Sequence, residues 1–534
     1  MRNTHISLYE GIKFQAERIP NNTALYYKGL NISYSKLLNS INKIAGYLSD
    51  MGISSKDVVT LCLPNFPTAV YLLYAVNQNG NIVNMVHPLV SHTQMKGILE
   101  ETGSKYLFCL DTKYNDFQSL KQEGVKVIPC NPVDELQLVI RLAYEFQKRK
   151  ELKLAKHAKI KSANLLVHAP KKEFVHLDKE DQVYLHSGGT TSKSKTIALS
   201  SFAINSLANQ SEYILGTKNV SNKFMYGLLP MFHGFGLCMG IHSCLFMGAA
   251  DNLMPKFNVK ETVEYIKKNK LHYLIGIPPI YEALLANKDF HGEILKNLYV
   301  AYIGADFVSV DLMNRFNKRM EEAGSKCQIF EGYGLTETVT VITVNSFKFC
   351  KMGSVGKPLP TTKIRIRNLE NTEDKQTGIP GEIYCAGSTL MNGYRFGPDS
   401  PFWKDPETEE TWLKTDDMGY LDSEGFLHFK QRIKRIIKVS GIEILPTEIE
   451  QCVTGLPFVK ECVAKGVPDE KRGNMIKLFV VLNEGKGKVP DDFEAIIMNA
   501  VKEECGVYAQ PKTIVCMEKF PRTIVGKIDS KNMN

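Results

Sequence analysis

The sequence Ser187-Gly-Gly-Thr-Thr-Ser-Lys-Ser-Lys195 has the composition of a loop that holds a polyphosphate. Its adjacent glycines let the backbone turn and approach a ligand closely, while its hydroxyl and ammonium groups can donate hydrogen bonds to phosphate oxygens and offset their charge. Apolar residues at 183–185 and 196–199 predict short strands on both sides. Because a Walker loop needs Gly-Lys-Ser/Thr before a helix, this is either a different kind of phosphate loop or a flexible turn without a ligand.

Strand-like and helix-like stretches alternate through most of the chain around this loop. Strands are expected at 58–62, 82–86, 224–229, 273–277, 298–303 and 328–330, with helices between them. Such alternation predicts an α/β fold of mostly parallel sheets covered by helices. Ligands of these folds bind beyond the carboxyl ends of the strands, where the loops 187–195 and 331–337 both fall.

The composition is that of an ordinary globular chain, with 534 residues, of which 43% are hydrophobic and 23% charged. This length suffices for two or more domains. The twelve cysteines stand singly, without the spacing of a zinc site, and suit a reducing cytoplasm. The N-terminus lacks the apolar core of a signal peptide, and prolines interrupt the apolar window 58–76, so we expect a cytoplasmic protein without a membrane span.

Much of the net charge of +9 is concentrated in the segment 141–172, which contains ten Lys or Arg residues but only two acidic ones. Apolar residues recur at helical spacing around its start, at Leu136, Val139, Ile140, Ala143 and Phe146. The segment either makes a peripheral contact with an anionic surface, a membrane or an acidic carrier protein, or is a solvated helix and loop. Its two aromatic residues, Tyr144 and Phe146, lie near its start and are not interleaved with the lysines that follow, so no nucleic-acid partner is expected.

A second glycine-bearing segment, Glu331-Gly-Tyr-Gly-Leu-Thr-Glu337, and shorter motifs further along give the chain a resemblance to the adenylate-forming superfamily. This superfamily includes acyl-CoA synthetases, luciferases and the adenylation domains of peptide synthetases. The matching segments, in the family's order, are 187–195, Tyr333–Glu337, Asp417 before 419–425, Arg432–Lys434 and Gly526–Lys527. The resemblance therefore covers nearly the whole chain.

The resemblance implies a large N-terminal AMP-binding domain at 1–431 and a small mobile α+β domain at 432–534, with the hinge at Lys434. The sequence agrees with this division, because shorter strands and more turns follow residue 385. About a hundred residues remain after Arg432, which is a plausible domain size.

An acyl-CoA synthetase, the activity that the resemblance implies, activates a carboxylate with ATP. A carboxylate is a poor electrophile, but as acyl-AMP it carries a good leaving group, and CoA can then form the thioester. Since an anionic carboxylate must meet an anionic triphosphate, cations and oriented donors must neutralise charge as it develops. The implied cofactors and co-substrates are ATP, Mg²⁺ and CoA, and the implied partner is a small-molecule carboxylate.

The family pattern assigns nucleotide contacts to residues of both domains. The phosphates are expected to contact Ser187, Gly188, Gly189, Thr190, Thr191, Ser192 and Lys195. The adenine site is expected at Gly304, Ala305, Gly332, Tyr333 and Gly334. Asp417 and Arg432 are expected to bind the ribose. Thr336 is expected to donate to the α-phosphate, and Glu337 to bind Mg²⁺, which takes few protein oxygens beside phosphate oxygens.

Other positions concern the carboxylate and the thiol. His233 matches a family position beside the substrate carboxylate, although a histidine of the core is the alternative. Lys527 is expected to act in adenylation. Rotation about Lys434 would then withdraw Lys527 and bring Lys438 and Gly441 to the thiol tunnel.

Two rival functions stay open: loading the phosphopantetheine arm of a separate carrier protein, and a non-catalytic nucleotide-binding scaffold. Gly234-Phe-Gly-Leu follows His233 where peptide synthetases place an Asp, which favours a substrate without an α-ammonium group. The apolar runs 237–241 and 244–247 could line an acyl or aryl pocket or form core. The departures from the family pattern remove no catalytic group; they are Ser192, Ser194, Asp306 and Asp416.

Overall fold

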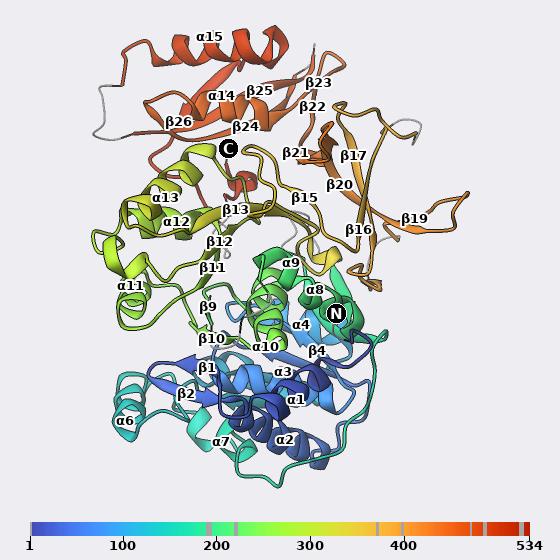
Figure 1. The fold of residues 1–534 in the computed structure, drawn as a ribbon, viewed down its shortest axis with the longest axis vertical. Coiled ribbons are helices and arrows are strands. Elements are labelled where there is room, and N and C mark those ends of the chain that lie inside the picture. The colour runs from blue at the N-terminus through green and yellow to red at the C-terminus, as the bar shows by residue number, and fades with distance from the viewer. Residues whose placement is uncertain are drawn as a thin grey trace. The chain divides into compact units, whose positions relative to one another are not determined.

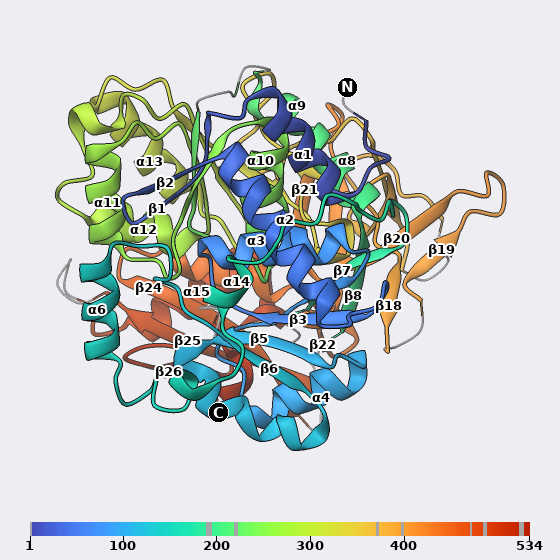
Figure 2. The same ribbon diagram turned by 90° about the horizontal axis from the view of Figure 1, so that it is seen from below.

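The computed structural model describes residues 3–187, 195–217, 220, 223–369, 373–396, 400–469, 472–483, 489–522 and 528–533. The chain forms two compact units, whose elements are labelled in Figures 1 and 2. The first unit consists of Met1–Ile364 and Cys385–Leu413, and the second of Arg365–Tyr384 and Lys414–Asn534. The predicted domain boundary at Arg432 lies inside the second unit and, with the hinge at Lys434, stays a prediction.

One sheet of the first unit carries the predicted phosphate loop between two of its strands. Its seven strands run in the order β18-β8-β7-β4-β3-β5-β6. The pairings from β7 to β6 are parallel, whereas β8 pairs antiparallel with β7 and β18. Loop 187–195 joins β7 to β8, as predicted. The bounds are β3 Val58–Cys62, β4 Ile82–Met85, β5 Tyr106–Leu110, β6 Lys126–Cys130, β7 Asp181–His186, β8 Thr196–Ser200 and β18 Gly393–Arg395.

The other sheet of the first unit has nine strands, in the order β15-β14-β13-β12-β11-β9-β10-β1-β2. The pairings from β13 to β1 are parallel, and those at both edges are antiparallel. The predicted α/β fold with mostly parallel sheets is therefore confirmed. The bounds are β1 Thr23–Tyr27, β2 Leu30–Ser33, β9 Phe224–Gly227, β10 Ala250–Leu253, β11 Tyr273–Gly276, β12 Val300–Ile303, β13 Gln328–Tyr333, β14 Thr343–Val344 and β15 Lys357–Pro358.

The helices of the first unit follow local sequence rules. Ser7 and Ser91 cap α1 and α4, since each side chain accepts a backbone N–H of the first turn. Helix α3 is buried along its whole length because its sequence is largely apolar. The bounds are α1 Leu8–Arg18, α2 Tyr34–Asp50, α3 Pro67–Gln78, α4 His92–Thr102, α5 Tyr114–Phe117, α6 Leu138–Gln147, α7 Ser162–Leu165, α8 Ser201–Asn209, α9 Ser211–Leu215, α10 Ser243–Met247, α11 Val259–Lys268, α12 Pro278–Ala286 and α13 Val310–Glu322.

The unit boundaries fall inside the strands β16, β17 and β20. The shorter strands expected after residue 385 are not what the structure has, since β20, β24 and β25 contain 11, 11 and 10 residues. Antiparallel pairing of β20 with β21 sets Asp417 opposite Arg432. Helices α14 and α15 contribute Ile449, Val453 and Ile497 to a core with β24 and β25. The bounds are β16 Thr362–Arg367, β17 Gly381–Gly387, β19 Phe402–Lys404, β20 Thr411–Leu421, β21 Leu427–Arg432, β22 Ile437–Val439, β23 Ile442–Ile444, α14 Pro446–Thr454, β24 Val459–Asp469, β25 Gly473–Leu482, α15 Phe493–Cys505 and β26 Thr513–Cys516.

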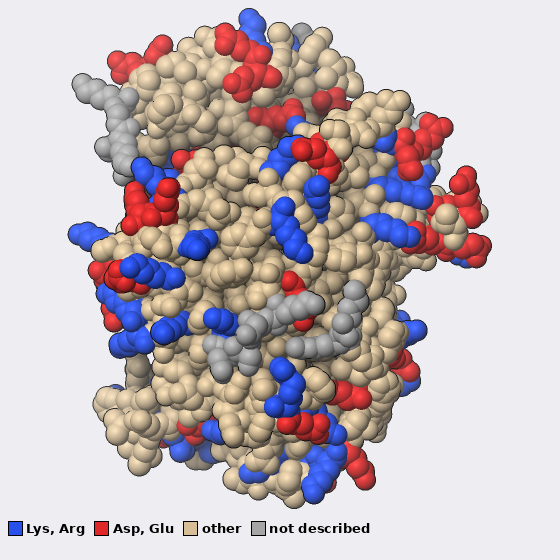
Figure 3. Space-filling view, in the orientation of Figure 1, with Lys and Arg blue, Asp and Glu red and all other residues tan. Residues whose placement is uncertain are grey.

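Charged side chains of both signs are scattered over the face of the molecule in Figure 3. Within the described ranges, no helix combines the length and the apolar composition needed to cross a bilayer. This agrees with the interpretation of the window 58–76, which forms the strand β3 and most of the helix α3.

Candidate functional site

Ser187 and Lys195 close the base of the predicted phosphate loop. The Ser187 N–H donates to the Lys195 carbonyl oxygen, and the Lys195 N–H donates to Ser187 Oγ, each at 3.0 Å. These bonds hold the chain together where the loop leaves the sheet. Five predicted phosphate contacts lie outside the described residues: Gly188, Gly189, Thr190, Thr191 and Ser192.

Tyr394 links this loop to the predicted metal-binding residue. Lys195 Nζ donates to Tyr394 Oη at 3.1 Å and lies 4.3 Å from the centre of its ring. Tyr394 Oη donates to Glu337 Oε1 at 2.9 Å. A cation, a phenol and a carboxylate from three distant segments thus form one hydrogen-bonded chain. The structure therefore brings the two glycine-bearing motifs to one place, as the position of both beyond strand ends predicts.

The buried Asp181 fixes the strand that carries Tyr394. Its carboxylate accepts hydrogen bonds from Asn392 Nδ2 at 2.9 Å and from Arg395 Nε at 2.6 Å, on either side of Tyr394. Strand β18 also pairs with β8, with Tyr394 opposite Ile197. Tyr394 was not predicted from the sequence, because its partners are far away in the chain and no local motif marks it.

His186, the last residue of β7, supports the loop without adding positive charge. Its Nε2 donates to Asn84 Oδ1 at 2.7 Å, an assignment that follows from the Asn84 amide donating to Thr60. Its Nδ1 then accepts from Thr196 Oγ1 at 3.4 Å. Burial lowers the pKa of His186 to about 4, so the imidazole is neutral at neutral pH.

The residues predicted to bind adenine line one cavity, at the carboxyl ends of β12 and β13. Gly334 is required there, since a Cβ at this position would lie 1.5 Å from the Thr340 carbonyl oxygen. The half-buried Tyr333 is among the residues that line this cavity, and a tyrosine ring is a group on which a planar base can stack. The lining consists of Ile214, Phe235, Met239, Tyr302, Ile303, Gly304, Ala305, Gly332, Tyr333, Gly334, Thr340, Val341 and Val344.

Glu331 lies within β13, directly before Gly332 of this cavity, and no role was predicted for it from the sequence. Burial raises the pKa of its carboxyl group to about 8. Glu331 is therefore mostly protonated at neutral pH. It adds little negative charge where an anionic nucleotide is predicted to bind.

Thr336 and Glu337 lie in a short 3-10 helix, η6 (Thr336–Thr338), that ends in an unusual turn. Val339 follows with φ +67° and ψ −56°, a rare conformation for a β-branched residue, and the Thr340 N–H donates to the Thr338 carbonyl oxygen at 2.8 Å. Strain of this kind costs roughly 1–3 kcal/mol and is found mainly at functional sites. The turn therefore agrees with a functional role for Thr336 and Glu337.

The segment that contains His233 approaches this turn. A Cβ at the neighbouring Gly234 would lie 2.4 Å from the Val339 carbonyl oxygen, so glycine permits the approach. His233 is half-buried, with its ring 4.8 Å from that of Phe232. These contacts bring His233 near the Thr336–Glu337 turn.

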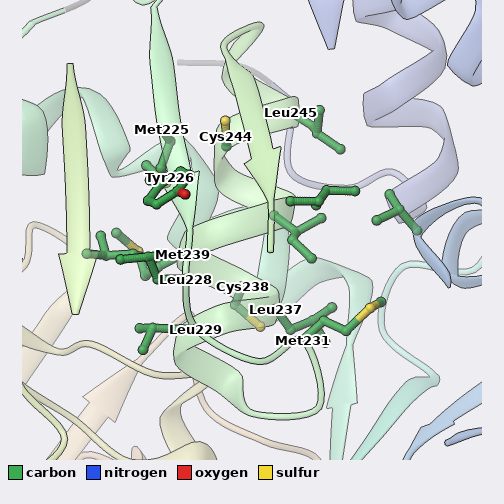
Figure 4. Packing of buried hydrophobic residues seen from close by; sticks show 14 of the residues in the cluster. Met225, Tyr226, Leu228, Leu229, Met231, Leu237, Cys238, Met239, Cys244 and Leu245 are labelled. Atoms are coloured by element: carbon green, nitrogen blue, oxygen red, sulfur yellow. The ribbon is translucent and has the colours of Figure 1, made fainter. Parts of the chain in front are cut away.

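A π-helix, η4 (Phe235–His242), follows His233, and such wide turns are frequent at functional sites. The apolar run 237–241 is buried in the main core, as Figure 4 shows for Leu237, Cys238 and Met239. Met239 and Phe235 also line the cavity described above. The run is therefore core for the most part, and Met239 is its one residue that reaches the predicted adenine cavity.

A second cluster of predicted residues lies in the second unit. Arg432 Nε is 3.3 Å from Oδ1 of the buried Asp417, and Lys434 Nζ donates to Asp416 Oδ2 at 2.9 Å. Asp416 has φ +60°, in the left-handed region that favours glycine. A buried carboxylate bordered by exposed cations suits a polyhydroxyl group next to phosphate.

The residues predicted for the thiol tunnel lie on a tight hairpin. Strands β22 and β23 are joined by Ser440 and Gly441, with φ values of +52° and +82°, as a type I′ turn requires. Lys438 is exposed, with Nζ 3.3 Å from Glu443 Oε1. Lys527 lies outside the described residues.

Glu337 is the residue predicted to bind Mg²⁺. Among the residues that the structure describes, no group of three or more His, Cys, Asp or Glu side chains could hold a metal. Mg²⁺ does not need such a group, because it commonly takes one or two carboxylates together with phosphate oxygens and waters. The half-buried Glu337, held by Tyr394, supplies one such carboxylate.

Two family models match the chain. The model described as AMP-binding enzyme matches residues 12–395, and that described as AMP-binding enzyme C-terminal domain matches residues 448–527. The predicted hinge at Lys434 falls between the two matches.

Similar curated proteins include a long-chain-fatty-acid–CoA ligase of Bacillus subtilis, 29% identical over 531 residues, covering 96% of this chain and 91% of the relative. Another is 4-coumarate–CoA ligase-like 6 of Arabidopsis thaliana, 26% identical over 519 residues, covering 95% of this chain and 86% of the relative. Among solved structures, ATP-bound MatB from Rhodopseudomonas palustris superposes with a TM-score of 0.82 at 20% identity, covering 99% of this chain and 98% of that one. This last likeness concerns the fold.

Proposed function

Because the chain belongs to the AMP-binding enzyme family, we propose that it is an acyl-CoA synthetase that activates a carboxylate with ATP. In the first half reaction, a carboxylate oxygen attacks the α-phosphorus and the bond to the β-phosphate breaks, which gives acyl-AMP and pyrophosphate. In the second, the sulfur of CoA attacks the acyl carbon, AMP departs with the electron pair of the broken C–O bond, and the thiol proton passes to solvent.

The hydrogen-bonded chain Lys195–Tyr394–Glu337 is the observation that carries this proposal. It joins the base of a phosphate loop to a carboxylate that suits Mg²⁺, beside the glycine-rich cavity predicted for adenine. A nucleotide whose base entered the cavity would direct its phosphates towards these residues. Charge neutralisation at fixed positions is what a reaction between two anions requires.

We assign the roles of the site residues on the same basis. Thr336 donates to the α-phosphate, Glu337 holds Mg²⁺, and His233 contacts the substrate carboxylate. Asp417 and Arg432 bind the ribose, and Lys527 stabilises charge during adenylation. Rotation at Lys434, with Lys438 and Gly441 then lining the thiol tunnel, stays part of the proposal and is supported by the family match alone.

For the substrate we propose an apolar carboxylic acid without an α-ammonium group. The similar curated proteins are named for long-chain fatty acids and for 4-coumarate. The segment after His233 is apolar and contains no acidic residue that could bind an ammonium group. The twelve cysteines, all unbridged, support the proposed cytoplasmic location.

The test is pyrophosphate release from ATP with a long-chain fatty acid, an aryl acid and an α-amino acid, using the full chain. We expect release with one of the first two and no release with the amino acid. Absence of release with every acid, from folded protein with Mg²⁺, would refute the activity. The rates of thioester formation with CoA and with a holo carrier protein show which of the two is the acceptor. A faster reaction with the carrier would make the chain a carrier-loading ligase.

A further inference from the structure

Helix α6 (Leu138–Gln147) turns its apolar side outward. Leu138, Val139, Leu142 and Phe146 are exposed by 64%, 75%, 57% and 74%, and none of the helix residues is buried. At 100° per residue these four side chains fall within one arc of about 100°. An ordinary surface helix has the opposite polarity, with its apolar stripe facing the core.

The exposure is not the result of a loosely attached helix. Tyr144, on the opposite side of α6, donates to Asp111 Oδ1 at 2.7 Å. The buried Leu136 and Leu152 fix the chain before and after the helix. Figures 1 and 2 both show α6 at the edge of the first unit, and the same place in Figure 3 is a bulge with few charged atoms. The apolar arc is therefore presented by an anchored helix.

Basic side chains follow this arc. Lys148 is paired with Glu151, at 3.2 Å. No ion pair joins Arg149, Lys150 or Lys153 to another residue within the described part of the chain, and all three are exposed. The guanidinium carbon of Arg149 lies 5.5 Å from the centre of the Phe146 ring, so positive charge borders the apolar surface directly.

We propose that α6 and the residues 149–153 form a docking surface for an anionic lipid bilayer. Apolar side chains on one side of a helix, bordered by Lys and Arg, are the combination that inserts at the boundary between headgroups and acyl chains. The fixed positive charge selects an anionic partner.

Sedimentation of the full-length protein with vesicles tests this proposal. We expect binding to vesicles of phosphatidylcholine mixed with phosphatidylglycerol, weaker binding to phosphatidylcholine alone, and loss of binding as salt rises. ATP and acid are absent from the assay, so its result does not depend on the proposed function. No binding to the anionic vesicles would overturn the proposal.

Two sets of variants locate the surface. L142E with F146E should lower the partition coefficient by about tenfold or more, and K150E with K153E by about tenfold. The matched controls are F14E, at an apolar residue exposed by 53%, and K179E with K318E, at exposed lysines elsewhere in the first unit. Equal losses in variants and controls would overturn the proposal.

A third measurement remains informative if the glutamate variants fold poorly. Brominated lipid in anionic vesicles should quench the fluorescence of the tryptophan added in L142W but not that of the tryptophan added in F14W. The fluorescence of the two native tryptophans is subtracted in both cases. Quenching of both or of neither contradicts the assignment. Concentration-dependent self-association that is abolished by L142E, without any vesicle binding, would show that a second copy covers the surface and would likewise overturn the proposal.

Discussion

The two clusters of predicted site residues hold their charges in different ways. In the first unit, Lys195 and Glu337 are half-buried and joined through Tyr394. In the second unit, the side chains of Arg432 and Lys434 are 60% and 67% exposed, and they form ion pairs with the buried Asp417 and the half-exposed Asp416. Exposed ion pairs are weak and easily exchanged. The first cluster thus holds its charges in a fixed hydrogen-bonded chain, while the cations of the second cluster lie at the surface of their unit.

The largest expected effect tests whether the second unit takes part in the reaction at all. We expect K527A to lower the rate of acyl-AMP formation by about 100- to 1000-fold, because it removes a cation from the developing charge. Thioester formation from supplied acyl-AMP should be nearly unchanged. Separate assays of pyrophosphate release and of thioester formation measure the two steps, and equal loss of both contradicts the role of Lys527.

The next largest effect should come from the prearranged carboxylate of the first unit. E337Q should lower kcat about 100-fold and raise the Mg²⁺ concentration needed for half-maximal activity, because a neutral amide is a weaker ligand. Titration of activity with Mg²⁺ is the measurement, with E321Q, at an exposed position, as the matched control. If the activity of E337Q depended on the Mg²⁺ concentration in the same way as that of the unaltered enzyme, Glu337 would not be a ligand of the metal.

In the second cluster, loss of charge should weaken nucleotide binding more than turnover. D417N should raise the KM for ATP about tenfold, since a hydrogen bond to a charged group contributes about 1.5–3 kcal/mol. Initial rates at varied ATP give the two constants, and D374N, at an exposed carboxylate of the same unit, is the control. A large fall in kcat at unchanged KM would mean that the ribose assignment is wrong.

Removal of the connecting hydroxyl should have a smaller effect. Y394F should raise the KM for ATP about fivefold, the equivalent of one hydrogen bond, and Y508F, at an exposed tyrosine, should not. In the double variant Y394F with E337Q, the loss in kcat/KM for ATP should be smaller than the two single losses combined, because both changes break the same contact. Full additivity would show that the contact has no energetic importance.

The smallest effect concerns stability. His186 has a pKa of about 4 in the folded protein and near 6.5 when unfolded, so the unfolded chain binds more protons between these values. Its neutral form favours folding above pH 6.5, and this contribution to the free energy of unfolding is lost as the pH falls towards 4. In H186Q the free energy of unfolding, measured with urea, should fall less between pH 6.5 and 4 than it does in the unaltered protein. An equal fall in both proteins would show that His186 is not the titrating group.

Local pattern was enough to predict many elements of this fold. The strand at 58–62 was predicted where the structure has it, because β-branched residues mark it. Strand β9 ends at Gly227, two residues earlier than predicted, and Leu228 and Leu229 are buried in the core beyond the end of its pairing with β10.

The remaining features depend on contacts between distant segments. Lys195 meets Tyr394 across 199 positions of sequence, and no pattern near either residue encodes that contact. The positive φ of Val339 could not be predicted from the sequence either, since a β-branched residue favours an extended backbone. For α6 the sequence predicts amphipathic spacing but cannot say which side faces solvent, because that depends on where Tyr144 finds its partner.

The discontinuity of the second unit limits how the protein can be divided. Thr415 donates to the Ile383 carbonyl oxygen at 2.7 Å, so the two segments of this unit are joined within it. A fragment that began at Lys414 would lose the strand containing Ile383 and expose an unpaired edge, which promotes aggregation. A fragment that began at Arg432 would leave that pairing intact in the remainder. After a single protease cut between Tyr384 and Lys414, the two fragments should stay associated, because the second unit contains residues of both.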